Sequence, residues 1–140
     1  MKIEFVASVA VITANAPESR RLYVDALGLP LQPFGGEYFA THELGGCKHF
    51  GVWPLEEAAQ ACFGTTSWPD DVPVPQMSLE FEVSDADAVA AAAAELRDDG
   101  YELLHDARLE PWGQTVARLI SPEGAVIGIS YAPALHELQP

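Results

Sequence analysis

An internal repeat constrains the fold of this chain more than any other feature of its sequence. The segments Ser8–Ile12 and Ser78–Val83 both have the composition of a strand, and each is followed by a helical pattern and then by further strands. The same order of elements twice over indicates two related modules. The chain has 140 residues, of which 49% are hydrophobic, and this is enough for two such modules to share one core.

The first module is predicted over residues 1–62. Pro17 lies near the start of a helical pattern and Gly28 lies just past its end, which is where these residue types frame helices. A linker rich in Pro and Thr follows over residues 63–76. The predicted elements of the module are a strand over 3–12, a helix over 17–27, strands over 37–43 and 47–53, and a helical turn over 55–61.

The second module is predicted over residues 77–133. Ser84 is the expected N-cap of an alanine-rich helix that ends at Gly100, and the residues Ser121–Gly124 form the expected turn of a closing hairpin. Residues 134–140 form a tail after this module, and the segment from Pro133 to Pro140 is expected to fray. The predicted strands of this module cover 77–83, 101–105, 114–120 and 125–131.

Charge and cysteine content exclude several classes of function. Seven Lys and Arg oppose 21 Asp and Glu, so the net charge of -14 repels nucleic acid and anionic membranes and favours a cationic ligand. No apolar run reaches the roughly 18 residues of a membrane span, and the N-terminal residues do not resemble a signal peptide, so we expect a cytoplasmic protein. Cys47 and Cys62 have no metal-binding spacing and are expected to be reduced thiols.

Strand alternation predicts which side chains face a shared cleft. If Phe81 and Val83 pack beneath the second helix, then Ser78, Glu80 and Glu82 lie on the opposite face of their strand. A carboxylate such as Glu80 is costly on a concave surface unless water or a cation compensates it. Glu80 is therefore expected either at a solvated rim or beside a cationic partner.

Several motifs of the chain resemble one known superfamily. The segment Ser19–Leu29 is similar to its first helix and following turn, and Val83–Ala88 is similar to its second strand-to-helix junction. The segments Pro111–Gln114 and Ala117–Gly124 resemble its closing hairpin. This is the vicinal oxygen chelate superfamily, which includes glyoxalase I, extradiol dioxygenases and bleomycin resistance proteins. The resemblance implies an α+β fold in which two βαβββ modules form curved mixed sheets around a cleft, often in a homodimer.

The resemblance also identifies where metal-using members carry their ligands. Those positions fall at Ser8 and Ser78 on the first strand of each module, and at about Gly51 and Gly128 on a late strand of each. Serine hydroxyls are weak ligands for divalent metals and glycine offers no side chain. We therefore expect no metal site of the usual kind and no cofactor.

The remaining candidates are aromatic or titratable side chains in or near the expected cleft. His42 and His49 are an alternative metal pair, and Glu80 is an alternative general base. Planar ligands are commonly held against tryptophan faces. The predicted ligand-binding residues are Tyr38, His49, Trp53, Trp68, Glu80 and Trp112.

Together these features predict a metal-free protein that sequesters a bulky aromatic or cationic small molecule, as drug-binding members of the superfamily sequester antibiotics. The alternative is a lyase, isomerase or dioxygenase that uses an atypical metal site or none. A third possibility is a metabolite sensor or accessory subunit, which an exposed apolar patch over Phe63–Trp68 would favour. The predicted partners are the small-molecule ligand and a second copy of the chain.

Overall fold

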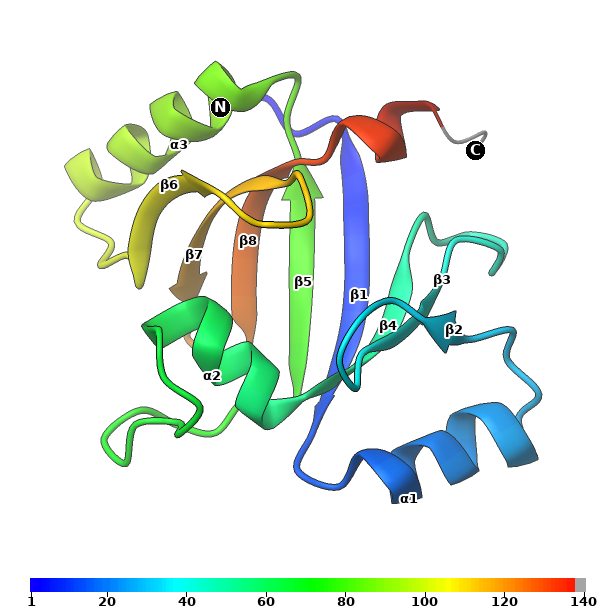
Figure 1. Cartoon of the computed structure of the whole chain (residues 1–140). Coiled ribbons are helices and arrows are strands. Elements are labelled where there is room, and N and C mark those ends of the chain that lie inside the picture. Colours follow the sequence, from blue (N-terminus) through cyan, green and yellow to red (C-terminus); the bar gives the residue numbers. More distant parts are fainter. Residues whose placement is uncertain (138–140) are drawn as a thin grey trace.

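One mixed sheet of eight strands organises the chain (Figure 1). The computed structural model describes residues 1–137, and the strand order in its sheet is β2-β3-β4-β1-β5-β8-β7-β6. The predicted α+β fold of two βαβββ modules is confirmed. In chain order the elements are β1 (Phe5–Thr13), α1 (Ala16–Arg20), the π-helical turn η1 (Arg21–Ala26), β2 (Gln32–Pro33), β3 (Phe39–Thr41), β4 (Phe50–Pro54), α2 (Leu55–Phe63), β5 (Met77–Glu82), α3 (Ala86–Asp98), β6 (His105–Leu109), β7 (Thr115–Ile120), β8 (Val126–Tyr131) and the 3-10 turn η2 (Pro133–Glu137).

The first strands of the two modules pair with each other at the centre of the sheet. β1 and β5 run antiparallel, with Ser8 opposite Glu80 and Ala10 opposite Ser78. In the internal repeat Ser8 corresponds to Ser78, and Ala10 corresponds to Glu80. The pairing therefore relates the modules by an approximate two-fold axis, and it brings all four side chains to one face.

The same symmetry gives equivalent places in the sheet to Gly51 and Gly128, the glycines on the last strand of each module. β4 pairs in parallel with β1 so that Gly51 lies beside Ala10, and β8 pairs in parallel with β5 so that Gly128 lies beside Glu80. Each glycine therefore adjoins the same repeat position of the central strands. The modules differ there in chemistry, because one carries a methyl group and the other a carboxylate.

The core of the second module lies on the other face of the sheet, beneath α3 (Figure 1). Alanines on the inner side of this helix are small enough to let it pack closely on β7 and β8. Phe81 and Val83 contribute to this core as strand alternation predicts, which turns Glu80 to the concave side. The buried residues of the cluster are Val83, Val89, Ala92, Ala93, Ala117 and Ile129.

The structure corrects several predicted boundaries. β6 begins at His105 rather than at Tyr101, because Gly100 turns the chain at a positive φ and Tyr101 still bonds back to Leu96 at the helix end. The predicted helix over 17–27 divides into α1 and η1, and the two-residue strand β2 was not predicted. No helix among residues 1–137 is both long and apolar enough to cross a membrane.

The C-terminal segment was predicted to fray, and this is wrong for residues 133–137. They form η2, which Figure 1 shows beside the end of β1, and Leu135 is buried. The prediction failed because a short polar tail gives no sign of the tertiary contacts that hold it. Residues 138–140 of the predicted tail lie outside the described part of the chain.

The N-cap of α3 is Asp85 and not Ser84. The Asp85 side chain accepts a hydrogen bond of 2.8 Å from the backbone N–H of Ala88, and its carboxylate lies at the positive end of the helix dipole. Ser84 precedes the cap by one residue and takes no part in it.

We expect Asp85→Ala to lower the free energy of unfolding by about 1 kcal/mol, because it leaves a helix N–H without its partner. Ser84→Ala is the matched control and should change stability by less than about 0.5 kcal/mol. Urea denaturation of both variants measures the difference. Equal losses in the two variants would contradict the assignment of the cap.

Candidate functional site

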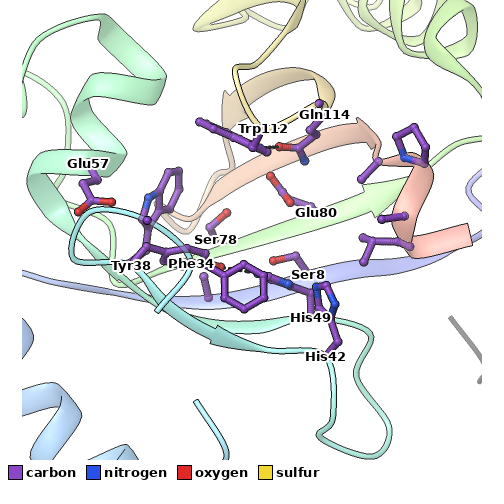
Figure 2. Close-up of a pocket in the computed structure, with 18 of the residues that line it drawn as sticks. Ser8, Phe34, Tyr38, His42, His49, Glu57, Ser78, Glu80, Trp112 and Gln114 are labelled. Atoms are coloured by element: carbon purple, nitrogen blue, oxygen red, sulfur yellow. Dashed lines mark hydrogen bonds between the residues drawn. The ribbon is translucent and has the colours of Figure 1, made fainter. Parts of the chain in front are cut away.

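A cavity of about 520 Å³ lies on the concave face of the sheet (Figure 2). This volume is within the range of sites that take drug-sized ligands. Ser8 and Ala10 of β1 and Ser78 of β5 line it, so the central strand pair contributes its floor. The other lining residues are Phe34, Gly35, Tyr38, His42, His49, Trp53, Glu57, Glu80, Trp112, Gly113, Gln114, Arg118, Ala132, Pro133, Ala134 and Leu135.

Aromatic rings form the half of the cavity that belongs to the first module. Phe34 meets His42 and His49 edge to face, with ring centroids 5.3 and 5.4 Å apart. Tyr38 stacks on His49 at 5.8 Å and meets Trp53 edge to face at 6.4 Å. The loop before β3, the connection between β3 and β4, and the strand β4 thus supply one continuous set of rings, which we call the aromatic half.

Tyr38 and His49 form the central hydrogen bond of the aromatic half. The Tyr38 hydroxyl lies 2.6 Å from His49 Nε2. Burial raises the pKa of Tyr38, with smaller contributions from Glu80, Cys47 and Glu57, so the phenol stays protonated. Burial, and to a smaller extent His42, lowers the pKa of His49 to about 4. At neutral pH the tyrosine therefore donates to a neutral imidazole.

Gly51 allows Tyr38 to take its position. A Cβ atom at residue 51 would lie 2.5 Å from Tyr38 Cε1 and Cζ and would overlap the hydroxyl. The tyrosine ring therefore occupies the space above β4 into which a side chain at position 51 would project. Glycine is required here for close approach, since its φ is not in the left-handed region.

We expect Gly51→Ala to displace Tyr38 and break its hydrogen bond to His49, with a loss of stability of about 1 to 3 kcal/mol. Gly45→Ala is the control, because nothing lies within 4 Å of a Cβ there. Thermal unfolding of both variants tests this expectation. A Gly51→Ala protein as stable as the control would show that Tyr38 does not occupy this space.

The neutral His49 predicts sensitivity to acid. Its pKa is lower in the folded state than in the unfolded chain, so unfolding takes up a proton between about pH 6.5 and pH 4. The contribution of His49 to stability is present above this window and is lost as the pH falls through it. His49→Gln should therefore lose less stability than the wild type from pH 7 to pH 4, as measured by the midpoint of thermal unfolding. Identical pH profiles would exclude a buried neutral His49.

Polar side chains form the half of the cavity that belongs to the second module, which we call the polar half. Figure 2 shows Glu80 below Trp112 and Gln114, which lie in the loop after β6, and above Ser8 and Ser78. Burial raises the pKa of Glu80, while the nearby Arg118 guanidinium and Gln114 amide oppose this rise. Glu80 also covers Gly128, where a Cβ atom would lie 3.1 Å from Glu80 Cγ.

Gln114 is held in place by two neighbours. Its amide nitrogen donates to Ser130 Oγ at 2.9 Å, and its amide oxygen accepts from Trp112 Nε1 at 2.8 Å. Trp112 is 60% exposed, so its indole lies at the mouth of the cavity with its N–H turned inward.

Arg118 is the buried cation of the polar half, with only 1% of its surface exposed. Its Nη1 lies 3.3 Å from the carbonyl oxygen of Ala61, 3.1 Å from His105 Nε2 and 3.4 Å from Glu110 Oε2. Arg108 also pairs with Glu110, at 2.8 Å. Burial lowers the pKa of His105, and Arg118 adds to the effect, so His105 accepts the hydrogen bond as a neutral ring.

The turn η2 closes one end of the cavity. Glu82 Oε2 accepts hydrogen bonds from the backbone N–H of Ala132 at 2.5 Å and from His136 Nε2 at 2.9 Å. The side chain of Glu82 is fully buried, and burial raises its pKa. This attachment brings Leu135 and its neighbours against the cavity, where they cover part of its apolar wall.

The residues at the four superfamily ligand positions do not fit a metal ion. Ser8 and Ser78 offer only hydroxyls, and Tyr38 and Glu80 already occupy the space above Gly51 and Gly128. Among residues 1–137 no group of three or more His, Cys, Asp or Glu side chains is arranged to hold a metal ion. His42 and His49 stand with ring centroids 4.8 Å apart, without a third ligand of these types in the described chain.

Five of the six predicted ligand-binding residues line the cavity, and Trp68 does not. Trp68 lies in the linker, packs edge to face on Phe63 at 4.8 Å, and donates its indole N–H to carbonyl oxygens of Val72 and Pro73. The structure brings together Tyr38, His49, Trp53, Glu80 and Trp112.

Sequence reasoning missed Arg118 and Gln114 as cavity residues, and it left Phe34 out of the predicted ligand-binding set although it considered this ring for the cavity. A signal for Arg118 was present in the closing hairpin. With a turn at Ser121–Gly124, residue 118 falls opposite Gly128, which was already placed in the cleft. Phe34 lies in a loop, where no periodicity shows the direction of a side chain.

No protein-family model matches the chain, and no curated protein sequence matches it. Several solved structures do match the chain. A variant of the methylmalonyl-CoA epimerase of Streptomyces coelicolor matches with a TM-score of 0.60 and 16% identity, over 99% of this chain and 100% of the epimerase. A glyoxalase/bleomycin resistance protein/dioxygenase superfamily member from Vibrio splendidus 12B01 matches with a TM-score of 0.56 and 15% identity, over 92% and 98% of the two chains.

The chain has the fold of the glyoxalase/bleomycin resistance/dioxygenase superfamily. The resemblance found in the sequence is therefore confirmed at the level of fold. The 2,2',3-trihydroxybiphenyl 1,2-dioxygenase of Sphingomonas wittichii strain RW1 also matches, with a TM-score of 0.58 and 14% identity, over 91% of this chain and 42% of the dioxygenase. Proteins with unlike activities share this fold, so the function of this chain has to be argued from its cavity.

Proposed function

We propose that this protein binds a drug-sized aromatic molecule in the cavity without a metal ion and sequesters it unchanged, as an antibiotic-binding protein would. The aromatic half carries this proposal. Phe34, Tyr38 and Trp53 present rings to the same enclosed space, and the Tyr38–His49 hydrogen bond fixes their arrangement. Rigid rings lose little conformational freedom when a planar ligand stacks on them.

Size and energy are consistent with such a ligand. A dissociation constant of about 1 μM corresponds to roughly 8 kcal/mol. Burial of apolar ligand surface contributes about 25 cal/mol per Å², and each aromatic contact adds about 0.5 to 1.5 kcal/mol. The cavity therefore has enough apolar wall for micromolar binding without a metal bond.

The polar half argues against a cationic ligand group at that end. Although the whole chain carries a charge of -14, exposed charges are screened beyond about 8 Å at physiological ionic strength. Arg118 lines the polar half itself, so a cationic ligand group placed beside it would meet a like charge at close range. We therefore favour the aromatic character of the ligand over the cationic character that the overall charge suggests.

An enzyme is the second candidate function. Glu80 faces the cavity and burial raises its pKa, so it is a candidate to take a proton from a ligand and to return it. This observation favours a metal-free lyase or isomerase over a dioxygenase, because proton transfer needs no redox-active group. Recovery of the ligand separates the candidates, since sequestration returns it unchanged and an enzyme does not.

We expect planar aromatic compounds to quench tryptophan fluorescence saturably in the presence of a chelator, with dissociation constants near the micromolar range. Trp53→Ala should weaken binding about tenfold, measured by isothermal titration calorimetry, because it removes a ring from the cavity wall. Trp68→Ala is the control and should leave the affinity unchanged. Binding that appears only after divalent metal is added would refute the proposal.

A further inference from the structure

One edge of the Arg118 guanidinium is left without a protein partner. All of its side-chain hydrogen bonds to residues 1–137 use Nη1. The opposite edge, formed by Nε and Nη2, presents two parallel N–H groups in the spacing that matches a carboxylate. Because Arg118 lines the cavity, this fork is available to a ligand.

The serines of the cavity floor are also without side-chain partners. Ser8 and Ser78 are 6% and 3% exposed, and neither hydroxyl makes a hydrogen bond to residues 1–137. Both serines line the cavity and neither hydroxyl is a fully buried atom, so both are open to a ligand placed there. Two hydroxyls and a guanidinium fork around one cavity therefore indicate a polar ligand group at this end.

The charges around Arg118 balance only when one more negative charge is present. Arg108 and Arg118 together face a single firmly paired carboxylate, Glu110, and His105 is neutral because its pKa is lowered by burial. Without a ligand, ionised Glu80 supplies the missing charge. A ligand anion beside Arg118 would supply it instead, and Glu80 would then be favoured in its protonated form.

Several titratable groups lie on the elements packed around Glu80. Arg118 on β7 and Glu110 after β6 act on it directly. Glu80 also acts electrostatically on Tyr38, in the loop before β3, and on Cys62, on α2. Burial raises the pKa of both groups, to about 11 for Cys62, so both are neutral near pH 7. Glu82, two residues along β5, is bound to Ala132 and His136 instead.

We infer that the cavity takes an aromatic carboxylic acid, whose carboxylate pairs with the Nε–Nη2 edge of Arg118 while protonated Glu80 donates a hydrogen bond to it. The inference rests on the proposed binding function and names its ligand class. The ring of the ligand lies in the aromatic half, and its acid group lies over the serines. Glu80 acts as the specificity-determining residue, since its ionised form would repel the ligand.

This arrangement couples binding to proton uptake. An aromatic carboxylate stays ionised above about pH 6, so the pH dependence of its affinity comes from the protein. Once the pH exceeds the pKa of Glu80, Glu80 must take up one proton for each ligand molecule that binds. The affinity should then fall by up to about tenfold per pH unit.

The test uses three probes that share one ring system: 2-naphthoate, neutral 2-naphthamide and cationic 2-naphthylmethylamine. Calorimetric titrations between about pH 6 and pH 9 should show that wild-type protein prefers naphthoate and loses affinity for it as the pH rises. Glu80→Gln resembles the protonated side chain, so its affinity for naphthoate should not fall with pH. Glu56→Gln, on the exposed side of α2, should behave as wild type.

Arg118→Lys tests the fork separately from the charge. It should weaken naphthoate binding about tenfold or more, and weaken it more than it weakens naphthamide binding, because lysine has no bidentate edge. Tighter binding of naphthamide or the amine than of naphthoate would overturn the inference and leave the proposed function intact. A pH profile of Glu80→Gln that equals the wild-type profile would also overturn it. If none of the three probes binds, the proposed function itself fails.

Discussion

The antiparallel pairing of β1 with β5 is the constraint on which the rest of this structure depends. It joins the modules through main-chain hydrogen bonds, and it sets the register in which Ser8 faces Glu80 and Ala10 faces Ser78. A slip of one residue would turn these side chains into the core and bring Phe81 and Leu79 to the cavity. Such a slip would expose apolar side chains that pack under α3, so the hydrophobic effect stabilises the observed register. The packing of this core therefore also determines which side chains face the cavity.

Two similar modules form a cavity with two unlike halves because a few positions break the repeat. Ala10 and Glu80 are equivalent in the sheet, yet one is a methyl group and the other a carboxylate. The glycines beside them are covered by different side chains, an aromatic ring in one module and the carboxylate in the other. A ligand with one apolar and one polar end therefore has a single orientation that satisfies both halves.

Strand alternation allowed much of this to be predicted from the sequence. Period-two patterning is a local property, and it correctly turned Glu80 to the cavity and Val83 to the core. Two surroundings were expected for Glu80, a solvated rim or a cationic partner, and Arg118 corresponds to the second. The ring of Tyr38 over Gly51, the attachment of Leu135 and the separate position of Trp68 could not be predicted. The first two depend on contacts between segments far apart in the chain, and Trp68 depends on contacts within its own linker, so none of them leaves a periodic signal.

The covered glycine at position 51 has a consequence for how this protein can change over evolutionary time. Any side chain that a mutation introduces at that position needs the space that Tyr38 fills. A mutation at residue 51 alone is therefore disfavoured until Tyr38 has been replaced by something smaller, and loss of Tyr38 first removes the hydrogen bond to His49. The two positions are epistatic, and neither order of substitution passes through an undamaged intermediate. This pair therefore disfavours, by sterics, any substitution that would place a larger side chain at residue 51.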